Sequence, residues 1–212
     1  MVQILLHEPD HPLNEKLLQQ MFRLRHRIFK KNLRWDVASS NGMERDYYDT
    51  MSPVYCLCLD DSGQVIGCWR LMQTAKPYLL KDVFPKLLGD HPPPSSPTVW
   101  EASRFAYSLE KNANLSFGGV HEITSHLIAA LLETGLVYGL ERIVAVSEVC
   151  FERILKRSGV ITHRFAPPTL LGNTSAVAGW FDVTEENLRR VREAGHLPGN
   201  VIPPRRRATQ AA

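Results

Sequence analysis

The stretch that decides the fold is Val99-Trp100-Glu101-Ala102-Ser103-Arg104-Phe105-Ala106-Tyr107. Its aromatic and small residues follow a proline-rich loop at residues 91–97, and this pattern predicts a buried strand. A carboxylate and a guanidinium are unexpected inside such a strand. Side chains three residues apart point to opposite faces of a regular strand, so Glu101 and Arg104 either have separate roles or are brought together by a bulge. From this stretch alone, a structural ion pair is the favoured interpretation.

The length and composition predict one domain. The chain has 212 residues, of which 44% are hydrophobic, and it contains no internal repeat. We expect a single domain over residues 1–200 and a polar, flexible tail over residues 201–212. The net charge of +3 is unevenly distributed, because acidic residues gather between Glu44 and Asp61 and arginines crowd the C-terminal part. That basic part is compatible with an ordinary solvated face and with a surface that docks an acidic partner.

Several functional classes lack the sequence features that they require. The N-terminus has no basic region followed by an apolar one, and no apolar run approaches the roughly 20 residues of a membrane span. The four cysteines and eight histidines are not spaced as metal ligands. The basic stretches 189–192 and 205–207 lack the interleaved aromatic residues of a nucleic-acid-binding segment. The sequence predicts a cytoplasmic protein with no metal, no membrane insertion and no nucleic-acid partner.

Hydrophobic periodicity outlines the remaining elements. Helices are expected at residues 13–28, 77–88 (short), 123–134, 151–157 and 184–194, and strands at 1–6, 54–59, 64–72, 99–107, 142–149, 161–165 and 176–183. The polar segment 30–50 carries several aromatic residues and is typical of a binding lid. This order predicts an α/β (α+β) fold, one mixed sheet with helices on its faces.

Charged residues recur where strands and the lid-like segment are expected. The six that stand out are three arginines and three carboxylates: Arg25, Arg70, Arg104, Asp46, Asp49 and Glu101. Each alone is more readily explained as structural, but six in a chain of this size indicate one shared site. A balanced cluster suits a zwitterionic ligand, since carboxylates receive its cationic groups and arginines its carboxylate. Phe29 and Trp35 add ring faces that attract cations.

Four blocks of the first half resemble the LuxI-type family of N-acyl-homoserine lactone synthases, the autoinducer synthases of bacterial quorum sensing. The blocks are Arg25-His26-Arg27-Ile28-Phe29 with Leu33 and Trp35; Gly42-Met43-Glu44-Arg45-Asp46-Tyr47-Tyr48-Asp49; Gly67 through Arg70-Leu71 with Thr74, Pro77-Tyr78-Leu79-Leu80 and Phe84; and Trp100-Glu101-Ala102-Ser103-Arg104-Phe105. They occur in the family's order, which makes the resemblance specific. It is looser over residues 115–183.

The resemblance implies a fold like that of the GNAT-type acyltransferases, a three-layer sandwich in which a mixed, twisted sheet splays apart to admit a phosphopantetheine arm. It implies acyl transfer from acyl carrier protein, or from acyl-CoA, to the amine of S-adenosylmethionine. Lactonisation then releases methylthioadenosine. No cofactor is implied beyond these co-substrates, and a monomer is expected. The chain lacks an R-x-x-G-x-G pyrophosphate loop, which favours a carrier protein as donor. The alternative is a GNAT-type N-acetyltransferase that uses acyl-CoA and another amine.

The resemblance also implies roles for individual residues. Catalytic roles fall to Glu101, Arg104 and Arg70, and S-adenosylmethionine binding to Arg25, Phe29, Trp35, Asp46, Asp49, Phe84, Arg104 and Phe105. The acyl chain is expected against Trp69, Met72, Ser103, Val146, Ser147 and Val149, and carrier-protein docking at Arg153, Lys156 and Arg157. Glu101 is the expected base. Burial would raise its pKa and a neighbouring arginine would lower it, and the sequence leaves the outcome open, as it does the acyl-chain type.

Overall fold

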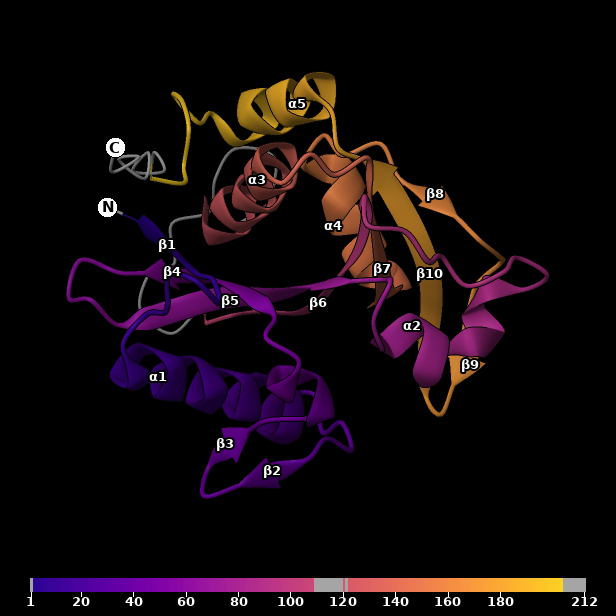
Figure 1. Ribbon diagram of the computed structural model, residues 1–212, viewed down its shortest axis with the longest axis horizontal. Coiled ribbons are helices and arrows are strands. Elements are labelled where there is room, and N and C mark those ends of the chain that lie inside the picture. Colours follow the sequence, from indigo (N-terminus) through magenta and orange to yellow (C-terminus); the bar gives the residue numbers. More distant parts are fainter. Residues whose placement is uncertain (1, 109–119, 121, 204–212) are drawn as a thin grey trace, which may run out of the picture.

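The computed structural model describes residues 2–108, 120 and 122–203, and its centre is one eight-stranded mixed sheet (Figure 1). The strands follow the order β1-β4-β5-β6-β7-β10-β8, with β9 paired to β10. Their bounds are β1 Gln3–His7, β4 Val54–Leu59, β5 Val65–Gln73, β6 Val99–Tyr107, β7 Arg142–Glu148, β8 His163–Arg164, β9 Thr169–Leu171 and β10 Thr174–Asp182. The stretch 99–107 is therefore a strand over its whole predicted length, in the middle of the sheet.

Helices cover both faces of this sheet, which gives the three layers expected of a GNAT-like fold (Figure 1). Helices α1 (Glu15–Arg25) and α2 (Leu79–Asp82) lie on one face, and α3 (Glu122–Val137) and α4 (Val149–Arg157) on the other. Helix α5 (Glu185–Gly195) packs on the outside of α3. A short 3₁₀ turn, η3 (Pro85–Leu88), follows α2.

Two hydrophobic clusters explain how the strands β4 and β5 are held between α1 and α3. Tyr55, Leu57 and Cys68 face α1, whereas Cys56 and Trp69 face α3, as the alternation of side chains along a strand requires. The close approach of α3 explains a glycine in β5: a Cβ at Gly67 would lie 2.9 Å from Leu127 Cδ1. The indole Nε1 of Trp69 donates to the carbonyl oxygen of Leu127 at 2.9 Å.

Strands β6 and β7 are parallel and diverge along their length. Their register runs only from Val99↔Arg142 to Ala102↔Ala145, although β6 continues to Tyr107 and β7 to Glu148. Beyond Ala102, β6 therefore has no ladder partner on its β7 side. This is the splay expected of the fold.

The lid-like segment between α1 and β4 is more structured than a loop. Helix α1 begins at the N-cap Asn14, whose side chain accepts from Leu17 N at 3.0 Å, and it continues into a π-helix, η1 (His26–Asn32). A small hairpin of β2 (Ser39–Ser40) and β3 (Met43–Glu44) follows, and then a 3₁₀ helix, η2 (Tyr47–Thr50). A π-helix is rare and is frequently found at functional sites.

Three expectations about the second half need correction. The strand predicted at 161–165 is limited to His163–Arg164, β9 was not predicted, and α4 begins two residues early, at Val149. Residues 204–212 of the predicted tail lie outside the described residues, whereas Val201 and Ile202 are anchored: Glu133 on α3 accepts from both of their backbone N–H groups at 2.9 Å. Within the described ranges, no helix is long and apolar enough to cross a membrane.

Candidate active site

A β-bulge in β6 decides which side chains share the site. Cys68 pairs with Ala106 and Arg70 pairs with Ser103, so Trp69 alone lies opposite both Arg104 and Phe105. Arg104 has φ of 56°, a positive value like that of the first residue of a G1 bulge, where glycine is usual. Ser103 and Arg104 consequently face the same side of the sheet, toward α1 and the lid segment. Of the two alternatives left by the sequence, the bulge is confirmed.

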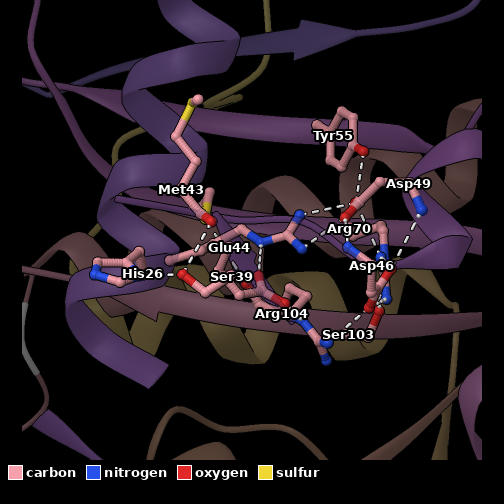
Figure 2. Close-up of polar contacts among 12 residues, drawn as sticks. His26, Ser39, Met43, Glu44, Asp46, Asp49, Tyr55, Arg70, Ser103 and Arg104 are labelled. Carbon is pink, nitrogen blue, oxygen red and sulfur yellow. Dashed lines mark hydrogen bonds and ion pairs between the residues drawn. The ribbon is translucent and has the colours of Figure 1, made fainter. Parts of the chain in front are cut away.

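Arg104 is not paired with Glu101, so the favoured ion pair is wrong. Its Nε donates to Glu44 Oε1 at 3.0 Å and its Nη2 to Asp46 Oδ2 at 2.6 Å. Arg70 approaches Asp46 from β5, with Nη1 2.6 Å from Oδ1 and Nη2 3.1 Å from Oδ2. Asp46 therefore lies between two guanidinium groups (Figure 2).

A third arginine, at the end of α1, completes the arrangement. Arg25 donates to Asp49 through Nη1 and Nη2, both at 2.8 Å, and through Nε to Glu44. Arg70 Nη1 also reaches Asp49 Oδ1 at 2.9 Å. We call these three arginines and three carboxylates the ionic network: Arg25, Glu44, Asp46, Asp49, Arg70 and Arg104. All six charges are paired, as buried ions must be.

Exposure separates the ionic network into an inner and an outer part. The side chains of Arg25, Glu44, Asp49 and Arg70 are 0% exposed, whereas those of Asp46 and Arg104 are each 13% exposed. Only the outer pair can touch a ligand without rearrangement of the others. The inner four are braces that hold the outer pair.

The lid segment is fixed to this network through its backbone. Asp46 is the N-cap of η2, and its Oδ1 accepts from Asp49 N at 3.2 Å while Asp49 Oδ2 accepts from Asp46 N at 2.8 Å. This reciprocal arrangement is a capping box. The two lid aspartates therefore hold each other as well as the arginines.

The pKa values of the inner groups follow from burial and charge together. Burial favours the neutral form of Asp49, yet the hydrogen bonds and charge of Arg25, and then Arg70, hold its pKa well below the usual range. Burial alone would lower the pKa of the Arg25 and Arg70 guanidinium groups, but the surrounding carboxylates outweigh it and raise both. Asp49, Arg25 and Arg70 are thus charged at every ordinary pH.

Glu101 has partners of a different kind. Its Oε2 accepts from Leu79 N at 2.9 Å and its Oε1 from Leu80 N at 2.7 Å, so it fastens the first turn of α2 to β6. Burial raises the pKa of Glu101 to about 7, against the two N–H groups and the charges of Arg70 and Arg104, which lower it. Burial therefore decides the question that the sequence left open. Each oxygen retains a lone pair with which to accept a proton.

The predicted aromatic residues lie in three places. Phe29 and Trp35 stack at 5.2 Å with an interplanar angle of 9°, and the Arg104 guanidinium lies over Phe29 at 5.6 Å. Phe84 is half-buried between α2 and η3, beside the cluster of Tyr48, Met72 and Leu79. Phe105 lies on the opposite face of the sheet, where it packs against Phe151 of α4 at 4.8 Å. The bulge explains this, because the strand resumes its alternation after Arg104.

The predicted acyl-chain residues are divided between the two faces. Met72, Ser103 and Val146 lie on the α2 side, and Ser103 Oγ accepts from Arg70 Nε at 3.1 Å. Trp69 lies on the α3 side, and strand alternation places Ser147 there too. Val149 is the first residue of α4.

The predicted docking residues lie on α4. Arg153, Lys156 and Arg157 are all exposed, but Lys156 is bound to Glu152 at 3.1 Å. Glu152, which is buried, also binds Arg164 of β8. Arg153 and Arg157 are therefore the more available charges of this helix.

Sequence reasoning missed two members of the site. Glu44 bridges Arg25 and Arg104, and Tyr55 Oη donates to Asp49 Oδ1 at 2.7 Å. Glu44 lies in the quoted block 42–49, two residues before Asp46, and this position was the available signal. Tyr55 looked like an ordinary strand residue. Among the residues that the structure describes, no group of histidine, cysteine or acidic side chains is arranged to hold a metal ion.

The autoinducer synthase family model matches residues 11–191 of this chain. An acyl-homoserine-lactone synthase of Pseudomonas aeruginosa is 38% identical over 167 residues, which span 78% of this chain and 82% of that protein. The sequence similarity therefore extends over most of this chain and most of the Pseudomonas aeruginosa synthase.

Solved structures agree with the sequence match. The crystal structure of the AHL synthase LasI has a TM-score of 0.80 at 34% identity, covering 97% of this chain and 99% of that one. The CoA-dependent acyl-homoserine lactone synthase BjaI, solved with SAM and isopentyl-CoA, has a TM-score of 0.82 at 28% identity, covering 94% and 91%. The predicted GNAT-like architecture is confirmed by these similarities and by the sheet itself.

Proposed function

Because this chain belongs to the autoinducer synthase family, we propose that the outer edge of its ionic network binds S-adenosylmethionine and that Glu101 is the base for acyl transfer. The protein is an acyl-homoserine-lactone synthase, an acyltransferase, and not the N-acetyltransferase of the alternative interpretation. The observation that carries the site assignment is the exposure of Asp46 and Arg104 beside four fully buried partners.

The chemistry of the outer pair suits this zwitterion. Asp46 can receive the α-ammonium and Arg104 the carboxylate of the methionine portion. The stacked rings of Phe29 and Trp35 lie next to Arg104 and offer an aromatic surface to the adenosyl group and the sulfonium. Arg25, Asp49 and Arg70 then serve as braces, a narrower role than the one that the family resemblance implied.

Acyl transfer requires the amine to lose a proton. The α-ammonium first gives one proton to Glu101, directly or through a water, and a carboxylate with pKa about 7 is suited to receive it. The resulting amine nitrogen attacks the thioester carbonyl carbon, the C–S bond breaks, and the leaving thiolate takes the second nitrogen proton and departs as the thiol of the donor. Backbone N–H groups of β6 just beyond Ala102, where the ladder with β7 ends, are the proposed donors to the oxyanion.

Lactonisation needs no further base. A carboxylate oxygen of the acylated methionine portion attacks its own γ-carbon, and the bond from that carbon to the sulfonium sulfur breaks. The leaving group is neutral methylthioadenosine. The chain's contribution is to bend the substrate so that these atoms meet, and Arg104 is placed to hold the carboxylate during that step.

We propose acyl carrier protein as the donor, docked on α4. The exposed Arg153 and Arg157 follow the strand that borders the splay, and carrier proteins are acidic. BjaI uses CoA, so CoA is the competing donor to be tested. A cytoplasmic location, a monomeric state and the lack of a further cofactor stay predictions.

The reaction can be tested with purified protein, S-adenosylmethionine and matched panels of acyl-carrier-protein and acyl-CoA thioesters. Lactone and methylthioadenosine should appear together by mass spectrometry, faster with the carrier-bound donors. Asp46→Asn should weaken S-adenosylmethionine binding on the order of tenfold or more, since it removes the proposed ammonium partner. The control Asp36→Asn changes an exposed aspartate paired with Lys30 at 3.5 Å and should leave binding unchanged. Equal binding by both variants would contradict the site assignment.

A further inference from the structure

Tyr55 lies beside the ionic network, on β4, which pairs with the strand β5 that carries Arg70. It is 4% exposed and pairs directly with Arg70 across β4 and β5, so the two side chains stand side by side on the α1 face. Both reach the same atom: Asp49 Oδ1 accepts from Tyr55 Oη at 2.7 Å and from Arg70 Nη1 at 2.9 Å (Figure 2). Tyr55 is thus an uncharged residue that is hydrogen-bonded to the ionic network.

Asp49 is the most heavily bonded carboxylate of the network. Its Oδ1 accepts hydrogen bonds from Tyr55, Arg70 and Arg25, and its Oδ2 accepts from Arg25 and from the backbone N–H of Asp46. The rotation of this carboxylate therefore sets the position of the Asp46 backbone. Asp46 in turn carries one of the two exposed side chains of the network.

The Tyr55 ring is itself held on two sides. His7 of β1 lies 5.6 Å from it, and Phe22 of α1 meets it edge-on at 6.1 Å. Phe22 also lies under the Arg25 guanidinium at 5.2 Å. Burial and the charge of Asp49 raise the pKa of the Tyr55 hydroxyl, so it remains a donor at ordinary pH. The Tyr55 ring is packed on β4, which is hydrogen-bonded to a strand on each side, so its hydroxyl has little freedom to move. The arginines reach Asp49 through longer side chains with more rotatable bonds.

We propose that Tyr55 is a positioning residue of the synthase: its hydroxyl fixes the Asp49 carboxylate in the orientation that presents Asp46 to S-adenosylmethionine. This rests on the proposed site assignment. Removing the hydroxyl leaves Asp49 Oδ1 with two cationic donors, so the fold should survive. The expected loss is in the precision with which Asp46 is held, and it should appear in substrate binding.

The test is Tyr55→Phe, with S-adenosylmethionine affinity measured by calorimetry and turnover by methylthioadenosine release. We expect Kd and KM for S-adenosylmethionine to rise on the order of threefold to tenfold, with kcat within about twofold, because the lost interaction acts on binding. p-Aminophenylalanine at position 55 restores an N–H donor and should return KM to near the unmodified value. Should Tyr55→Phe fold poorly, p-fluorophenylalanine keeps the size of the hydroxyl without its donor and gives the same comparison.

Tyr138→Phe is the matched control, because Tyr138 Oη also donates to a buried carboxylate, that of Glu8, away from the ionic network. Both variants should lose similar thermal stability, but only Tyr55→Phe should raise KM. If Tyr55→Phe lowers only stability and the active fraction, as Tyr138→Phe does, Tyr55 is structural and the proposal is overturned. If Asp46→Asn leaves binding unchanged, the site assignment itself fails, which is a separate outcome.

Discussion

Asp49→Asn is the substitution that most directly probes how the ionic network holds the lid segment. The carboxylate accepts five hydrogen bonds, from Arg25, Arg70, Tyr55 and the backbone of Asp46, and its side chain is 0% exposed. An asparagine has the same shape, but one of its two ends is an NH₂ group that must face the N–H donors. Two fully buried guanidinium groups would each lose one of their two carboxylate partners, since Arg25 keeps only Glu44 and Arg70 only Asp46.

The magnitude follows from this uncompensated burial. Removing one partner of a buried ion pair costs about 3–5 kcal/mol in the free energy of unfolding. For a chain of this length, each kcal/mol lowers Tm by about 2–4 °C, so we expect a decrease of about 6–20 °C. S-adenosylmethionine binding should fall with it, because Asp46 loses its backbone anchor.

Thermal and urea unfolding followed by circular dichroism provide the assay. Asp182→Asn is the control: the Arg142–Asp182 pair spans 3.1 Å with side chains 56% and 45% exposed, and such a pair contributes about 1 kcal/mol or less. The pKa of Asp49 is depressed by folding, so its contribution is present at neutral pH and is lost as pH falls below the unfolded value near 3.8. The variant should lack this acid-sensitive component. A loss for Asp49→Asn no larger than for Asp182→Asn would refute the bracing role.

Two further outcomes test the base and the docking surface. Glu101→Gln should slow acyl transfer by roughly 100-fold or more. In the unmodified enzyme, kcat/KM should fall as the pH drops below about 7, because the Glu101 carboxylate becomes protonated. This inflection in the pH profile should be absent from the variant. An inflection that persists in the variant would assign it to another group. Arg153→Glu should raise KM for acyl carrier protein on the order of tenfold, and more strongly at low salt. The control Arg23→Glu changes an exposed arginine of α1 and should leave this KM unchanged. An equal rise in KM for both variants would argue against docking on α4.

Strand patterning predicted the central part of the fold because it is a local property. The predicted bounds of β6 and β4 were correct, and those of β5 were correct to within a residue. Buried strands that lie between turn residues can be recognised from the order of apolar residues along the chain alone. The three-residue β9 and the π-helix were not foreseeable, because each is too short or too rare to leave a pattern. The sequence also could not place the bulge at Arg104, which depends on the register with β5.

The members of the ionic network were largely predictable, but their pairing was not. Three arginines and three carboxylates can be joined in many ways. The structural interpretation paired Arg104 with Glu101, whereas Glu44 is the glutamate that Arg104 binds. The difference is set by α2: its first N–H groups take both oxygens of Glu101 and so remove it from the arginines. No sequence pattern indicates which backbone amides a buried carboxylate will meet, because that depends on where α2 docks.

The succession of structural features along β6 explains how one strand directs functional candidates to both faces of the sheet. Glu101 lies where β6 is paired on both sides, with Met72 and with Val144, so the proposed base is on the part of the strand that two neighbouring strands hold. One residue later the pairing with β7 ends, and two residues after that the bulge turns Arg104 toward the lid. Phe105 then returns to the α4 face. A shift of the bulge by one residue would exchange the faces of Arg104 and its neighbour and separate the arginine from Asp46. The placement of the bulge, more than the identity of any one charge, is therefore what brings Arg104 to Asp46 on the same face of the sheet as the proposed base Glu101.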